Sequence, residues 1–114
     1  MQTEDTGMAT IDEFRYSTAD ATPPASLGFA LQALWWERKG DWEQAHGIVQ
    51  QHEGQSDCDW VHGYLHRQEG DTLNAGGWYR RAGQSLPTVL LPEEWELIAT
   101  ALLSRAGMET PHAS

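Results

Sequence analysis

The sequence predicts an all-α fold, and three observations support this. Apolar residues recur at spacings of three and four along several segments, as is typical of helices that bury one face. No segment shows the strict alternation that a half-buried strand requires. Glycine followed by aspartate separates the helical segments at Gly40-Asp41 and Gly70-Asp71, as expected where one helix ends and another begins.

The first two predicted helices meet at Gly40. The first opens at Pro23-Pro24 and stops at that glycine. Its apolar face consists of Leu27, Ala30, Leu31, Leu34 and Trp35. Asp41 is a suitable N-cap for the second helix, because its carboxylate accepts from unpaired backbone N–H groups, and Gln44 completes a capping box. We expect this second helix to extend to about His52.

Three more helices are predicted from similar capping, glycine and proline residues at their ends. They run from Ser56 or Asp57 to Gly70, from Asp71 to Gly83, and from Pro92 to about Ala106. An apolar connector over residues 86–91 joins the last two. Proline suits the first turn of a helix, because the N–H that it lacks would have no partner there.

The length of 114 residues allows a single folded domain. Residues 1–24 are acidic and poor in large apolar groups, which predicts a mostly disordered N-terminal arm. The helical domain is then expected over residues 25–106, and a short disordered tail over residues 107–114.

Composition argues against several classes of partner. Only 7 basic residues stand against 17 acidic ones, whereas nucleic-acid binding relies on an excess of Lys and Arg. No window approaches the roughly 20 consecutive apolar residues of a membrane span. The start of the chain lacks the pattern of a secretory signal, and the lone Cys58 excludes an internal disulfide. We therefore expect a cytoplasmic protein that binds neither nucleic acid nor membrane.

An internal repeat is the strongest signal in the chain. Residues 38–45 (RKGDWEQA) align with residues 68–75 (QEGDTLNA). In both, glycine takes the turn, aspartate caps the next helix, and an alanine four residues later lets the two helices approach closely. This alignment predicts a helix–turn–helix unit that is used twice.

The chain resembles the tetratricopeptide-repeat (TPR) family at the positions where that family uses small, turn, aromatic and proline residues. These are Gly63, Gly70-Asp71, Ala75, Tyr79, Ala82 and Pro87 in the second unit, and Ala33, Trp36, Gly40-Asp41-Trp42 and Ala45 in the first. The units repeat after 30 residues instead of about 34, so the loop between them is short. The segments 60–67 and 78–83 also resemble small bacterial TPR-like proteins. The resemblance implies a right-handed stack of five helices, the last of which caps the stack.

The TPR resemblance also implies that a protein or peptide binds in a concave groove lined by the first helix of each unit. By their place in the repeat, the groove residues are Leu34, Arg38, Trp60, Tyr64, Arg67 and Gln68. An aromatic pair beside an arginine suits a peptide or an anion. The alternative is that Trp60 and Tyr64 simply pack in a small core. A homodimer through Trp35, Trp36 or Trp95 is a further alternative, because stable stacks usually contain three or more repeats.

Histidines suggest a different function, a metal-binding or anion-binding domain. His62 and His66 are four residues apart on one predicted helix, a spacing that lets two imidazoles share a metal, and His46 is a candidate third ligand. With Arg67, the residues Arg80 and Arg81 would add positive charge for an anion. The alternatives are structural: each histidine donates to a carbonyl or a carboxylate, and the arginines are solvated.

Enzymatic activity and a bound cofactor are not expected. Cys58 and His62 lack the orienting group and oxyanion site of a nucleophilic centre. The chain also contains no glycine-rich phosphate loop and no G-x-S-x-G motif.

Overall fold

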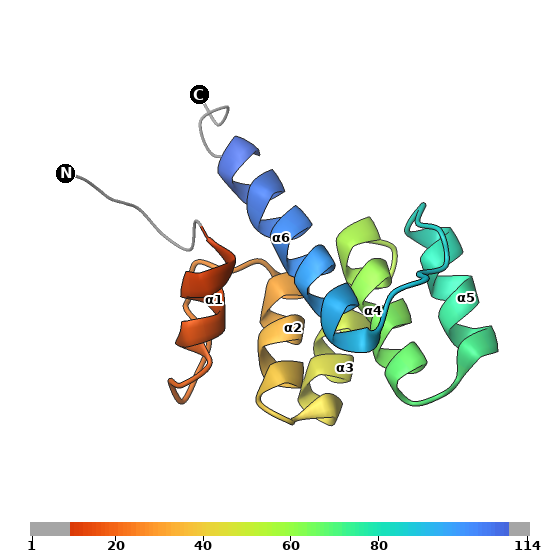
Figure 1. The fold of residues 1–114 in the computed structure, drawn as a ribbon, viewed down its shortest axis with the longest axis horizontal. Coiled ribbons are helices and arrows are strands. Elements are labelled where there is room, and N and C mark those ends of the chain that lie inside the picture. Colours follow the sequence, from red (N-terminus) through yellow and green to blue (C-terminus); the bar gives the residue numbers. More distant parts are fainter. Residues whose placement is uncertain (1–9, 110–114) are drawn as a thin grey trace.

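The computed structural model describes residues 10–109, and this range is helical without any strand (Figure 1). The helices are α1 (Ile11–Ser17), α2 (Phe29–Arg38), α3 (Trp42–Gln51), α4 (Ser56–Gln68), α5 (Thr72–Arg81) and α6 (Leu91–Glu109). The predicted all-α class is therefore confirmed for the described range. No helix within it is both long enough and apolar enough to cross a bilayer.

The helices α2 and α3 pack as one pair, and α4 and α5 pack as another. Each pair is joined by a turn whose glycine has a positive φ, +92° at Gly40 and +81° at Gly70, which residues with a Cβ rarely adopt. Asp41 accepts from the backbone N–H of Gln44 at 3.0 Å, as predicted. Asp71 is also an N-cap residue, but its side chain accepts no backbone N–H. The two Gly-Asp pairs therefore form two tight turns, and only the first turn has a side-chain cap.

The starts of two helices differ from the prediction. The helix α4 has Gln55 as its N-cap, so neither Ser56 nor Asp57 takes that position. The helix α2 begins only at Phe29, after turns that follow Pro23-Pro24. In both cases the N-cap residue makes no side-chain hydrogen bond to the helix. The sequence therefore has no capping side chain at these two positions from which the start could be predicted.

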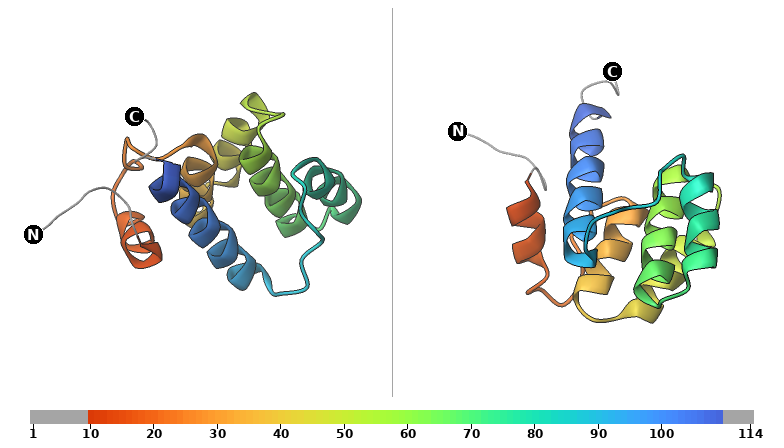
Figure 2. Two further views of the ribbon diagram at one scale, coloured as in Figure 1. Left: turned by 90° about the horizontal axis from the view of Figure 1, so that it is seen from above. Right: turned by 45° about the vertical axis from the view of Figure 1, so that its right-hand side comes forward.

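The helix α6 lies across α2 and α4 and also packs against α1 (Figures 1 and 2). We expected a cap that closes the stack, yet this helix instead covers the first helix of both pairs. Its buried face is an apolar stripe of Trp95, Ile98, Ala99, Leu102 and Leu103. The core of the protein consequently sits between α2, α4 and α6.

Indole N–H groups donate hydrogen bonds between helices. The Trp95 Nε1 donates to the carbonyl of Leu34 at 3.1 Å, and the Trp42 Nε1 donates to the carbonyl of Leu65 at 3.0 Å. The Trp35 Nε1 is satisfied by the hydroxyl of a serine in α1. Tryptophan thus buries a large apolar surface here without leaving its donor unpaired. Because Trp35 and Trp95 are buried, they do not offer the dimer surface that the sequence suggested.

The helix α1 corrects two predictions, the disordered arm over residues 1–24 and the total of five helices. Residues 1–9 lie outside the described range, but residues 11–17 are helical and dock on α6. Phe14 is fully buried and stacks on Trp95, with ring centroids 5.5 Å apart. Ser17 is also buried, and its Oγ accepts from Trp35. One aromatic side chain anchors a segment too short to show helical periodicity.

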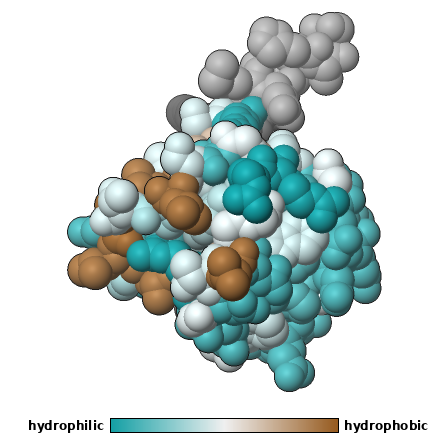
Figure 3. Space-filling model, turned by 90° about the vertical axis from the view of Figure 1, so that its right-hand side faces the viewer, coloured by the Kyte–Doolittle hydropathy of each residue, from teal (hydrophilic) through white to brown (hydrophobic). Residues whose placement is uncertain are grey.

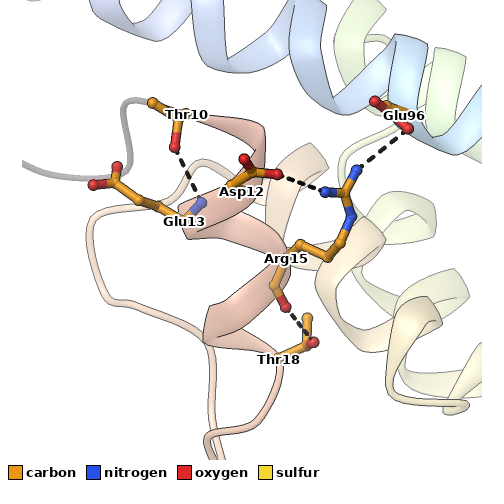
Figure 4. Close-up of polar contacts among 6 residues, drawn as sticks. All are labelled: Thr10, Asp12, Glu13, Arg15, Thr18 and Glu96. Atoms are coloured by element: carbon orange, nitrogen blue, oxygen red, sulfur yellow. Dashed lines mark hydrogen bonds and ion pairs between the residues drawn. The ribbon is translucent and has the colours of Figure 1, made fainter.

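Polar contacts hold α1 in place at its surface (Figure 4). Thr10 caps the helix by accepting from the N–H of Glu13 at 3.1 Å. Arg15 pairs with Asp12 at 2.8 Å within the helix and reaches Glu96 of α6 at 3.3 Å. These pairs are solvent-exposed and contribute little stability, so the docking of α1 rests mainly on its buried groups.

The C-terminal end also differs from the expectation. The helix α6 continues to Glu109, beyond Ala106 where the domain was expected to end. Residues 110–114, the remainder of the predicted tail over 107–114, lie outside the described range.

Phe14→Ala should lower the free energy of unfolding by about 3 kcal/mol, because it removes a fully buried ring and leaves a cavity beside Trp95. Denaturant unfolding followed by tryptophan fluorescence measures this. Tyr16→Ala on the same helix is the matched control, since Tyr16 is 77% exposed, and its effect should stay within about 0.5 kcal/mol. Equal effects of the two variants would contradict the docking of α1.

Gly63 is where α4 and α5 approach most closely. A Cβ at this residue would lie 3.3 Å from the carbonyl oxygen of Ala75 and 3.2 Å from the ring of Tyr79. Gly77→Ala, which has open space around it, should stabilise its helix by up to about 1 kcal/mol. Gly63→Ala should be less stable than Gly77→Ala by about 1–3 kcal/mol, because the crowding offsets the gain in helix propensity. Thermal unfolding of the two variants provides the measurement.

Candidate metal centre

The predicted groove along α2 and α4 is occupied by α6 of the same chain. Leu34 and Tyr64 are buried beneath this helix. Trp60 is half-buried, and the guanidinium of Arg105, from α6, lies 5.5 Å from its ring. Arg105 also pairs with Asp57 at the start of α4. The structural alternative for Tyr64, packing in the core, is the one observed.

Arg67 holds the start of α6 on α4. Its Nη1 donates to Glu94 at 2.6 Å, and its Nη2 donates to the carbonyl of Val89 at 2.6 Å. The Tyr79 hydroxyl donates a short hydrogen bond to the other oxygen of Glu94. Burial, together with Glu94, raises the pKa of Tyr79 well above its usual range. The guanidinium that the sequence assigned to a peptide or an anion is thus already bound inside the chain.

Three histidines converge on the opposite side of α4, where it faces α3. His46 comes from α3, and His62 and His66 come from consecutive turns of α4. The Nε2 atoms of His46 and His62 are 3.1 Å apart. One ring nitrogen from each of the three lies within 4.8 Å of the others. The predicted set of metal-ligand candidates is therefore brought together by the packing of α3 on α4.

Tryptophan rings form two walls around the histidines. Trp42 stacks on His46 with ring centroids 4.7 Å apart, and Trp78 of α5 stacks on His62 at 3.8 Å. The guanidinium of Arg81 lies over the outer side of Trp78, 4.7 Å from the ring centroid. These stacks limit the rotation of two of the imidazoles and so preorganise their nitrogens.

The environment favours the neutral form of His46 and His62. Burial, together with the nearby His46, His66 and Arg81, lowers the pKa of His62 to about 4. Burial also lowers the pKa of His46, with a smaller contribution from His66. A neutral imidazole has the free lone pair that a metal ion requires, so little proton competition is expected near pH 7.

Hydrogen bonding alone does not satisfy this cluster. The Nδ1 of His62 is buried without a partner, and the Nε2 of the same ring faces only the Nε2 of His46. The structural alternative, in which each histidine donates to a carbonyl or a carboxylate, fails for His62. His66 comes closer to it, with its Nδ1 3.8 Å from the carboxylate of Asp71.

The spacing of His46 and His62 suits a tetrahedral ion. Ligand nitrogens about 2.0–2.1 Å from a zinc ion stand roughly 3.3 Å from one another. The observed separation of 3.1 Å between His46 and His62 is close to this value. Three imidazoles with no thiolate favour zinc, copper, nickel or cobalt over magnesium or calcium. Asp71 beside His66 resembles the outer carboxylate that often orients a ligating histidine.

The arginines do not form the joint positive patch that the sequence suggested. Arg67 is bound to Glu94, Arg81 stacks on Trp78, and Arg80 is exposed on α5. Cys58 is buried, and burial raises the pKa of its thiol to about 11, the reverse of an activated nucleophile.

The two tryptophan walls were missing from the sequence-based site. Trp42 lies four residues before His46, so its place on the same helical face was readable from the spacing. Trp78 arrives from a different helix, and only the packing of α5 on α4 places it against His62.

Comparison with known proteins finds no family model, no curated protein and no solved structure that matches this chain. The TPR resemblance therefore stays a prediction, and the candidate site rests on its own geometry.

The stability of the metal-free protein should fall as the pH drops from 6.5 towards 4. His62 has a lowered pKa of about 4 in the folded chain and an ordinary value of 6.5, so the unfolded chain binds the extra proton first. Neutral His62 makes its full contribution to the free energy of unfolding above pH 6.5. Below pH 6.5 this contribution falls by up to about 1.4 kcal/mol per pH unit. Denaturant unfolding in EDTA at several pH values measures the slope.

In that series, His62→Gln should have a shallower slope between pH 6.5 and pH 5, because the titrating group is gone. His52→Ala, outside the cluster, should keep the slope of the unmodified protein. A slope unchanged in His62→Gln would show that other groups govern this pH range.

Proposed function

We propose that this protein binds a divalent transition metal ion of the zinc class through His46, His62 and His66. The observation that carries the proposal is the convergence of three imidazoles from two helices, with ring nitrogens within 4.8 Å of one another. A three-histidine set leaves one position of a tetrahedral ion for water or an external ligand.

The position of the cluster suggests what binding would achieve. His46 belongs to the first helical pair and His62 and His66 to the second, so an ion held by all three links the two pairs. An ion that binds only the folded chain stabilises it by about 2.7 kcal/mol when its concentration is a hundred times Kd. The proposed function is therefore metal binding coupled to the rigidity of the helical stack.

We also infer that the two pairs are TPR-like units. The support is the shared positive-φ glycine turn at Gly40 and Gly70 and the fully or nearly fully buried Ala45 and Ala75 at matching places. In this arrangement, α6 takes the concave face that such stacks offer to peptides. The peptide-binding module predicted from the sequence has less support than the metal site, because its Leu34 and Tyr64 are covered.

Metal binding is tested with protein purified without a histidine tag. Calorimetric titration with zinc should give a single ion per chain, and cobalt should give the strong visible absorption of a tetrahedral site. His46→Gln and His66→Gln, both at half-buried positions, should each weaken zinc binding about tenfold or more. Using two partly exposed positions avoids relying on buried His62, whose replacement threatens folding.

His52→Ala is the matched control. His52 stacks on Phe29 and lies outside the three-histidine cluster, so its loss should leave zinc affinity unchanged. Folding of every variant is checked by circular dichroism. Stoichiometry below about 0.1 ion per chain, or equal affinity in the cluster variants and the control, would end the proposal.

A further inference from the structure

A second pocket, separate from the histidines, lies where the start of α6 meets α2 and α4. Its volume is about 370 Å³, within the range of about 300–1,000 Å³ for small-molecule sites. Leu91, Pro92 and Trp95 of α6 form its apolar wall. Arg38 and Gln68, two of the residues predicted to line the groove, are among its polar residues. The pocket is thus the part of the predicted groove that α6 borders without filling.

Hydrogen-bond acceptors are concentrated on one side of the pocket. The Nε2 of Gln68 donates to Glu37 at 2.6 Å, which turns the Gln68 amide so that its Oε1 is left buried without a partner. Burial raises the pKa of Glu37 above its ordinary value, although Gln68, Arg38 and Tyr64 oppose this shift. A half-buried carboxylate that lines a pocket favours a ligand that brings positive charge and N–H donors.

A donor stands next to these acceptors. The guanidinium of Arg38 lies over Trp95, 4.8 Å from the ring centroid, and makes no ion pair or hydrogen bond within the described residues. Stacking uses the face of a guanidinium and leaves its N–H edge free for a carboxylate. The neighbouring Arg67 is already bound to Glu94 and Val89. Arg38 is therefore the arginine that is available to bind a ligand in this pocket.

We propose that this pocket binds a small zwitterion, an α-amino acid with an apolar side chain. Its ammonium group would contact the carboxylate of Glu37, its own carboxylate would contact Arg38, and its side chain would lie against Leu91 and Trp95. A ligand with only one charge leaves either the acceptors or the guanidinium unmatched, which is how the site would discriminate. This site shares no residue with the histidine cluster and is independent of metal binding.

The test compares three ligands that share the leucine side chain and differ in which charged group they keep. Calorimetry is done in the presence of EDTA, so that no amino acid–metal complex contributes. L-leucine keeps both charges, leucinamide keeps only the ammonium, and N-acetyl-leucine keeps only the carboxylate. Leucine should bind the full-length protein, and each derivative should bind about tenfold more weakly or worse, since each loses a charge-assisted contact.

Two variants assign the charges to residues. Glu37→Gln should weaken leucine and leucinamide but not N-acetyl-leucine, and Arg38→Gln should weaken leucine and N-acetyl-leucine but not leucinamide. Arg80→Gln, an exposed arginine outside the pocket, is the control and should change nothing. No binding of leucine, leucinamide binding as tightly as leucine, or equal affinity in all variants would overturn the proposal.

Discussion

The docking of α6 on α2 and α4 is the interaction on which the rest of the structure depends. Its centre is Glu94, a carboxylate that is only 3% exposed and receives both the guanidinium of Arg67 and the hydroxyl of Tyr79. Removing one partner of such a buried pair typically costs about 3–5 kcal/mol, because the other charge is left uncompensated. One turn of α6 thereby fixes the second helical pair, while Trp95 beside it binds the first through the carbonyl of Leu34.

This docking assigns different roles to the two sides of α4. On the α6 side, Tyr64 and Arg67 already have partners within the chain, and a pocket stays open at the edge near Arg38 and Gln68. On the α3 side, His62 and His66 meet His46 between two tryptophan rings. That face of α4 is not sealed by aliphatic packing, and it keeps one buried nitrogen without a partner. Each candidate site includes a residue with a buried polar atom that has no partner, His62 at one and Gln68 at the other. The molecular surface on the α5 side is largely hydrophilic, with hydrophobic residues toward one edge (Figure 3). The exposed leucines Leu86 and Leu90 belong to the connector that leads into α6.

The high tryptophan content has a physical explanation. Each of the six indoles has a defined contact: three donate hydrogen bonds that join helices, one stacks on His62, and Trp60 lies under Arg105. Trp36 packs edge-on against Trp35. A chain of 114 residues has few side chains with which to build a core. Each tryptophan buries a large apolar surface and has only one polar group that needs a partner. Trp42 and Trp78 wall the histidines, and Trp95 borders the pocket beside Arg38.

The sequence by itself determined the helical class, the two glycine turns, the cap at Asp41 and the spacing that puts His62 and His66 on one face. These features are local, because periodicity, positive φ and N-capping involve residues within a few positions of one another. Only the tertiary structure decided that α1 docks through Phe14, that α6 takes the groove, and that Trp78 and His46 meet His62. Each of these joins residues far apart in the chain, and such contacts depend on which surfaces find complementary partners, which no local pattern records.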